Sequence, residues 1–237
     1  MLSQRTLGIA RLGIVEYEAA LALQNALVNA RIADRIGDTM LLLEHPHTFT
    51  LGRGADESFI LPQRPSDVPI HRVSRGGEVT YHGPGQIVGY PILKLTGRDR
   101  DVGLYLRRLE EVIIRELDKF DIAAGRREKL TGVWVGPRKI ASIGIGIRRW
   151  VTYHGFALNV NCDLDYFRAI VPCGIDGCEM TSIEALTGAK AKISEVCAAL
   201  EQPSRSVFGY NELTTLDSAE LWHLLDGAAP VIEPPTQ

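Results

Sequence analysis

Residues 139–162, KIASIGIGIRRWVTYHGFALNVNC, decide the fold of this chain. Apolar side chains alternate with small or polar ones over most of the stretch, and a period of two is typical of strands with one buried face. The shorter segment GVWVG at 132–136 has the same character. We therefore expect a β-sheet built around these residues.

Two segments N-terminal to this stretch have the sequence pattern of long helices. Residues 16–36 are rich in Ala and Leu and free of Gly and Pro, which predicts a first long helix. A second helix is expected over 102–120, with Asp101 as its N-cap. Its predicted apolar stripe consists of Leu104, Leu106, Leu109, Val112, Ile113 and Leu117.

The order of the remaining elements predicts the sheet type. Two short strands are expected within 39–54, and the other expected strands are at about 70–74, 78–82 and 86–94. Short helices are expected at about 164–170, 180–187 and 191–201. Because helices and strands do not alternate regularly, we expect an α/β (α+β) fold whose mixed or largely antiparallel sheet is flanked by helices.

Length and composition bound the class of protein. The 237 residues, 45% of them hydrophobic and 23% charged, suit one globular domain, which we place at 1–205. Residues 206–237 are expected to be a C-terminal extension, partly helical or loose. The net charge of −3 and pI near 6.1 argue against nucleic-acid binding, and no apolar run is long enough to predict a membrane span. We expect a monomeric cytoplasmic protein.

Cys173 is the candidate nucleophile. It lies between Pro172 and Gly174, and this setting favours a chain reversal that displays the thiol. A reactive thiol must be ionised, and Lys139 is the candidate for stabilising the thiolate. Cys162 and Cys197 fall on apolar faces and are predicted to be core residues. Cys178, which follows a glycine near Cys173, is the weaker alternative nucleophile.

The glycine-rich stretch 74–86, SRGGEVTYHGPGQ, is a candidate binding loop. Glycine lets the backbone approach a long thin ligand, while neighbouring polar side chains hold its head. The alternative is a pair of hairpin turns. The stretch matches neither a phosphate loop nor a dinucleotide fingerprint, so no nucleotide cofactor is predicted. His45 and His47 with Cys173 and Cys178 are a weak metal pattern, and we expect no metal.

Four segments in order resemble a known family. They are RGGEVTYHGPGQIVGYPIL at 75–93, GVWVGPRKIASIGI at 132–145, HGFALNVNCDL at 154–164, and the Pro-Cys-Gly turn followed by Thr181-Ser182. They resemble the signature stretches of the octanoyl-(acyl carrier protein):protein N-octanoyltransferases, the lipoyl(octanoyl) transferases of lipoate biosynthesis. The resemblance covers roughly residues 40–187 and implies the biotin/lipoate protein ligase fold.

The resemblance also implies the site and the reaction. It places the family's thioester-forming cysteine at Cys173 and its lysine at Lys139. The implied substrate-binding residues are Arg75, Gly76, Gly77, Glu78, Val79, Thr80, Tyr81, His82, Ser142, Ile143, Gly144, Gly155, Phe156 and Ala157. His154 is either a further lining residue or only the end of a strand.

The implied enzyme is an acyltransferase that needs no cofactor. Its donor would be octanoyl-acyl carrier protein, and its acceptors would be lipoyl domains of 2-oxoacid dehydrogenases and the glycine cleavage H protein. Two alternatives share the fold: an ATP-dependent lipoate or biotin protein ligase, and a noncatalytic acyl-binding protein. An essential cysteine would distinguish the transferase from the ligase, and a covalent octanoyl adduct would distinguish it from the noncatalytic binder.

Overall fold

The strands expected from the alternating segments form the middle of a mixed eight-stranded sheet. The computed structural model describes residues 5–174, 177–217 and 221, and of Cys173 it describes only the backbone. The strand order is β11-β1-β2-β6-β10-β9-β8-β7, with β1 parallel to both neighbours and the other pairs antiparallel. A second sheet has the order β4-β3-β5. The predicted mixed sheet is confirmed.

The strands of the large sheet are β1 (Thr6–Ile14), β2 (Asp38–Glu44), β6 (Gln86–Ile92), β7 (Gly125–Arg127), β8 (Leu130–Val135), β9 (Arg138–Arg148), β10 (Val151–Asn159) and β11 (Glu212–Leu216). Those of the small sheet are β3 (Thr48–Leu51), β4 (Ile70–Arg72) and β5 (Val79–His82). The helices are α1 (Tyr17–Ile32), α2 (Val102–Asp118), α3 (Ile183–Thr187), α4 (Ile193–Ala199) and α5 (Glu201–Phe208). Short 3-10 helices are η1 (Glu57–Phe59), η2 (Gly97–Asp99), η3 (Leu164–Ala169) and η4 (Pro172–Gly174).

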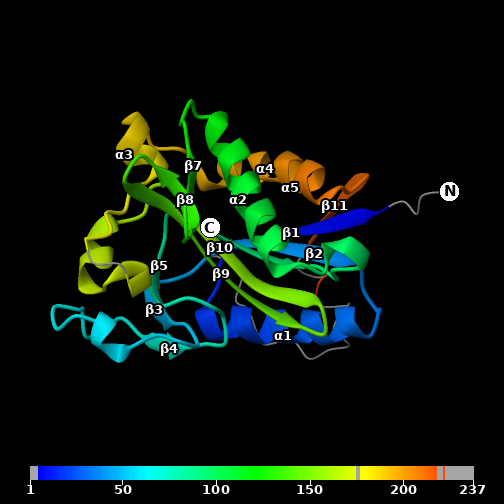
Figure 1. Ribbon diagram of the computed structural model, residues 1–237, viewed down its shortest axis with the longest axis horizontal. Helices are drawn as coiled ribbons and strands as arrows, with labels where there is room; N and C mark the ends of the chain where they lie inside the picture. Colours follow the sequence, from blue (N-terminus) through cyan, green and yellow to red (C-terminus); the bar gives the residue numbers. More distant parts are fainter. Residues whose placement is uncertain (1–4, 175–176, 218–220, 222–237) are drawn as a thin grey trace.

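Helices cover both faces of the large sheet, as Figure 1 shows. On one face α1 packs Leu23 and Leu27 against Leu41 and Val88 of the sheet. On the other face α2, α4 and α5 enclose the larger core. The predicted flanking of the sheet by helices is therefore confirmed. Within the described residues, no helix combines the length and apolar character needed to cross a bilayer.

The first helix ends earlier than the predicted limit at 36. It stops at Ile32, and Asp34 adopts a left-handed backbone with φ of 55°. Arg31 donates from Nε to Asp38 Oδ1 at 2.8 Å and pairs with Asp34. These bonds turn the chain back towards β2 before Gly37, the first glycine after the helix, is reached.

The second helix begins as predicted, but its buried stripe differs. Asp101 accepts from Leu104 N at 3.0 Å and is the N-cap. Leu104 is exposed and Leu106 only half-buried, whereas Tyr105 packs into the core. Apolar spacing does not predict this buried face, because the face also includes Tyr105, Glu110 and Glu116, which are buried by tertiary contacts.

Both ends of the described chain meet at one edge of the sheet. β11 pairs in parallel with β1, which the sequence reading did not predict. The expected C-terminal extension lies outside the described residues from 218 onward, except for Leu221, which is buried. The expected helix at 191–201 is the pair α4 and α5, which meet at Leu200. Residues 206–217 of the expected extension thus continue α5 and add a strand to the main sheet.

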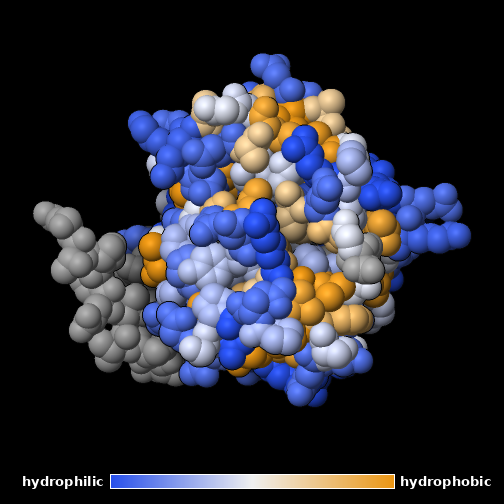
Figure 2. All heavy atoms as spheres, turned by 90° about the vertical axis from the view of Figure 1, so that its left-hand side faces the viewer, coloured by the Kyte–Doolittle hydropathy of each residue, from blue (hydrophilic) through white to orange (hydrophobic). Residues whose placement is uncertain are grey.

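The surface beside α3 and the small sheet is mixed in character. Figure 2 shows this face, where groups of hydrophobic residues are separated by hydrophilic ones. Phe59 and Ile60, from the region around η1, are partly buried here against Ile170 and Phe167. These contacts fix the segment that leads into η4.

Candidate active site

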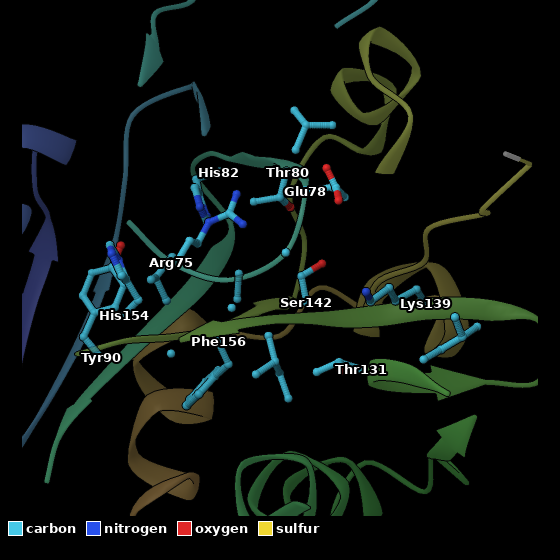
Figure 3. A pocket seen from close by; sticks show the side chains of 18 of the residues that line it. Arg75, Glu78, Thr80, His82, Tyr90, Thr131, Lys139, Ser142, His154 and Phe156 are labelled. Carbon is cyan, nitrogen blue, oxygen red and sulfur yellow. The ribbon is translucent and has the colours of Figure 1, made fainter. Parts of the chain in front are cut away.

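A cavity of about 290 Å³ lies where β9, β10 and the glycine-rich stretch meet (Figure 3). Its volume is near the lower end for small-molecule sites. The lining residues come from α1, β5, β6, β8, β9, β10 and their connections. They are Tyr17, Arg75, Gly77, Glu78, Val79, Thr80, His82, Val88, Tyr90, Lys129, Leu130, Thr131, Lys139, Ser142, Ile143, Gly144, His154, Gly155, Phe156 and Ala157.

Strand register brings the predicted segments together. Ser142 pairs with Ala157 and Gly144 with Gly155 across the antiparallel β9–β10 ladder. The glycine-rich stretch crosses β9, since Gly76 N–H donates to Ile145 O at 2.8 Å. A Cβ on Gly144 would lie 2.8 Å from Gly76 O, so only glycine permits this crossing.

Most of the predicted binding residues line the cavity, but Gly76 and Tyr81 do not. On β5, Thr80 and His82 reach the cavity, while the Tyr81 side chain packs into the core under the small sheet. The hydroxyl of Tyr81 is 2.7 Å from Nδ1 of His47, and its ring stacks on Tyr166 with centroids 4.8 Å apart. Alternation along the strand sends this side chain to the opposite face.

Several lining residues were missed by the sequence reading. Tyr17 comes from the start of α1, Val88 and Tyr90 from β6, and Thr131 from β8. His154, for which two readings were open, also lines the cavity. Lys129 and Leu130 complete the set. No local signal marks Tyr17 or Tyr90, because only the packing of α1 and β6 against the sheet brings them here.

Lys139 is buried at the cavity wall, with 2% of its surface exposed. Its Nζ lies 5.4 Å from the centroid of the Trp134 ring. Gly132, with φ of +127°, leaves room for the side chain, since a Cβ there would lie 2.5 Å from Lys139 Cε. A buried lysine of this kind needs its surroundings to compensate for lost hydration.

The turn that carries Cys173 packs against the same cavity. A Cβ on Gly174 would lie 3.2 Å from Cγ of Glu78, a lining residue. The chain then returns to β9, where Lys139 N–H donates to Glu179 O at 2.8 Å and Thr181 N–H donates to Lys139 O at 2.9 Å. The backbones carrying the two predicted catalytic residues therefore adjoin one cavity, while the side chain of Cys173 lies outside the described part.

The other cysteines differ in environment. Cys162 and Cys197 are buried, and burial raises the pKa of each thiol to about 12. They are core residues, as predicted, because a thiol with so high a pKa is not ionised at neutral pH. Cys178 is partly exposed.

The histidines of the weak metal pattern bind other partners. His45 contacts Val15 O and the Tyr90 hydroxyl, each at 2.7 Å, and His47 contacts Tyr81. Across the residues that the structure describes, no group of three or more His, Cys, Asp or Glu side chains is arranged to hold a metal ion.

Comparison with solved structures identifies the class of fold. A bipartite lipoate protein ligase from Thermoplasma acidophilum matches with a TM-score of 0.65 at 17% identity, over 94% of this chain and 93% of that one. A biotin protein ligase from Aquifex aeolicus matches with a TM-score of 0.50 at 14% identity, over 86% of this chain and 69% of that one. The fold is that of the lipoate and biotin protein ligases.

Sequence comparison identifies the family within this fold class. The model of the lipoyl protein ligase A/B catalytic domain matches residues 16–203. An octanoyltransferase from Caldicellulosiruptor bescii is 46% identical over 225 residues, which make up 92% of this chain and 98% of the relative. The chain belongs to the lipoyl protein ligase A/B catalytic domain family, and it is an acyltransferase.

Proposed function

We propose that the protein transfers an octanoyl group from octanoyl-acyl carrier protein to a lysine of a lipoyl domain, through a thioester on Cys173. The observation that carries this proposal is the convergence of the Lys139 side chain and the Cys173 turn on one partly apolar cavity. The octanoyltransferase relatives support the acyl group, and the lipoate ligases of the same fold support a lipoyl-domain acceptor. We expect the protein to act as a monomer.

In the first half-reaction the Cys173 thiolate attacks the carbonyl carbon of the donor thioester. The carrier leaves as its thiol after taking up a proton, and the enzyme keeps the acyl group as a new thioester. In the second half-reaction the lysine amine of the acceptor attacks that thioester and loses a proton. Cys173 leaves as the thiolate, so the enzyme is regenerated and no ATP is consumed.

Lys139 is proposed to act on the thiol and on the amine. As an ammonium group near Cys173 it would favour the thiolate, which is the nucleophilic form. Once neutral, it could accept the proton that the attacking amine loses. The rate of Cys173 alkylation against pH in Lys139→Ala, compared with the original protein, tests the first role. If the two alkylation profiles superimpose, Lys139 does not activate the Cys173 thiol.

Apolar lining supplies binding free energy for the chain. Val88, Ile143, Phe156 and Ala157 line the cavity. At about 0.8 kcal/mol per buried methylene, a chain of this length could contribute roughly 5 kcal/mol.

Intact-protein mass spectrometry after incubation with octanoyl-acyl carrier protein tests the proposal. We expect one octanoyl adduct that hydroxylamine removes, that is absent from Cys173→Ala and that is retained in Cys178→Ser. An adduct still present in Cys173→Ala would exclude the thioester on Cys173. Transfer by Cys173→Ala that depends on ATP would instead favour the ligase alternative, and retention of free octanoate without any adduct would favour a noncatalytic binder.

A further inference from the structure

Glu78 is the only carboxylate among the described residues that line the cavity. It belongs to the glycine-rich stretch, and Figure 3 shows it across the cavity from β9, the strand that carries Lys139. A Cβ on Gly174 would lie 3.2 Å from Glu78 Cγ, so the Cys173 turn packs directly against this side chain. The carboxylate therefore lies beside the turn on which the thioester is proposed to form.

Close backbone contacts fix the position of Glu78. Gly52 N–H donates to Glu78 O at 3.1 Å, and a Cβ on Gly52 would lie 1.9 Å from Gly77 O. Gly77 has φ of +83°, a conformation that residues with a side chain rarely adopt. This crossing of two backbone segments holds Glu78 at one place in the cavity wall.

One oxygen of the Glu78 carboxylate lacks a donor. Oε2 is buried, and no described residue makes a hydrogen bond to it. The nearby cation Arg75 donates from one guanidinium nitrogen to Thr50 O and Oγ1, each at 2.8 Å. Lys129 is exposed and pairs with Glu128 at 3.9 Å. Because a buried carboxylate oxygen without a donor is costly, a cation that enters the cavity gains a charge-assisted hydrogen bond there.

The charge of the cavity changes when the acyl-enzyme forms. The sulfur of Cys173 then belongs to a neutral thioester, so the negative charge of the thiolate is lost, whereas Arg75 and Lys129 stay charged. An acceptor lysine arrives as an ammonium at neutral pH, and these cations repel it. Among the described lining residues, only Glu78 carries a negative charge that offsets this repulsion.

We propose that Glu78 binds the ammonium group of the acceptor lysine and orients it towards the thioester on Cys173. This inference rests on the proposed function. The ammonium donates to Oε2 of Glu78, releases one proton to solvent, and attacks the thioester carbon as the neutral amine. The new C–N bond forms while the C–S bond breaks, the nitrogen gives its second proton to neutral Lys139, and Cys173 leaves as the thiolate.

Single-turnover transfer from isolated octanoyl-enzyme to a lipoyl domain tests the proposal. Glu78→Gln keeps the shape of the side chain and removes its charge. We expect octanoyl-enzyme formation to change by less than about twofold, while the lipoyl-domain concentration that gives the half-maximal rate rises about tenfold. Hydroxylamine is a neutral nucleophile at neutral pH, so it should release the octanoyl group from both proteins at the same rate.

Glu57→Gln is the matched control. Glu57 is an exposed carboxylate that pairs with Arg72 and does not line the cavity. It lies in η1, which meets the Cys173 turn through Phe59, since a Cβ on Gly174 would lie 3.0 Å from the Phe59 ring. This variant should therefore leave both half-reactions unchanged.

The pH dependence of lysine transfer gives a second readout, which a purely structural role would not change. A neighbouring carboxylate raises the pKa of an ammonium, so Glu78→Gln should move the midpoint of the transfer rate to lower pH by about one unit. Burial lowers the pKa of His82 and of His154, so both histidines remain neutral over this range. The two lining tyrosines and the cations Arg75, Lys129 and Lys139 are the same in both proteins.

Equal slowing of octanoyl-enzyme formation and of lysine transfer in Glu78→Gln would overturn the proposal, because the residue would then only support the structure of the site. Unchanged lysine transfer would also overturn it. Failure of the proposed function is separable, because the original protein would then form no octanoyl-enzyme. In that event, calorimetric binding of octylammonium still tests the ammonium site, and equal affinity of the original protein and Glu78→Gln would contradict it.

Discussion

Among single residues, Gly132 has the most direct influence on the predicted catalytic lysine. Its φ of +127° is a conformation that residues with a side chain rarely adopt. A Cβ at this position would also lie 2.7 Å from Ala141 O. The glycine thus allows β8 to pass close to β9 while Lys139 extends into the cavity.

Gly132→Ala should therefore displace Lys139 and reduce transfer more strongly than it reduces stability. We expect a stability loss of about 1–3 kcal/mol from backbone strain and a fall in single-turnover rate of at least about tenfold. Gly136→Ala is the matched control, because Gly136 also has a positive φ, of +57°, but its Cβ would meet nothing within 4 Å. Equal transfer rates in the two variants, measured alongside urea unfolding, would contradict the role of Gly132.

At the scale of secondary-structure elements, Glu110 links α2 by a hydrogen bond to β8, the strand that packs against Lys139. It is fully buried, accepts from Gly132 N–H at 3.2 Å, and pairs with Arg107 at 2.6 Å and Arg126 at 3.0 Å. A carboxylate with three donors satisfies its hydrogen-bonding capacity although it lies on the buried face of a helix. The conformation of β8 at Gly132 therefore depends on a helix that does not touch the cavity.

Glu110→Gln should destabilise the protein by about 1–3 kcal/mol, because the amide keeps an acceptor but loses the charge shared with the two arginines. Glu111→Gln removes the neighbouring carboxylate, which is partly exposed and pairs with Arg115 and Arg126. We expect its cost to stay below about 1 kcal/mol. Chemical denaturation measures both, and a smaller loss in Glu110→Gln than in Glu111→Gln would disprove the link.

Across the whole molecule, buried neutral histidines should make stability depend on pH. Desolvation lowers the pKa of His45 to about 4 and of His154 to about 3, and it also lowers that of His82. Below about pH 6.5 the unfolded chain binds protons at these positions and the folded chain does not. Stability is therefore greatest above this pH and falls as the pH decreases towards 4.

We expect the free energy of unfolding at pH 5.5 to be lower than at pH 7.5 by about 1 kcal/mol for each such histidine. Urea unfolding at the two pH values measures the difference. His154→Asn should show a shallower dependence, since one titrating group is removed and asparagine tolerates a positive φ. Equal stability of the original protein at both pH values would rule out the effect.

The C-terminal stretch beyond residue 205 should be required for folding. Tyr210 donates from its hydroxyl to Asp38 Oδ2 at 2.8 Å, Phe208 packs on Tyr105 with centroids 5.9 Å apart, and β11 completes the sheet edge. A chain ending at Arg205 loses two buried aromatic side chains, each worth about 3–5 kcal/mol, against a typical total of about 5–15 kcal/mol. We expect no cooperative thermal transition by circular dichroism.

A chain ending after Leu221 keeps all of these contacts and is the reference for that experiment. Matching melting temperatures for the two truncated chains would show that residues 206–221 are an appendage, as the sequence alone suggested.

The sequence by itself determined the elements whose signal is local. Alternation over 139–162 specifies β9 and β10, Asp101 specifies the start of α2, and the ordered motifs indicate most residues that line the cavity. Tertiary packing alone determines that β11 pairs with β1, that Tyr81 faces away from the cavity, and that Tyr17 and Tyr90 line the cavity. Periodicity reports which face of an element is buried, but it does not report which distant segment covers that face.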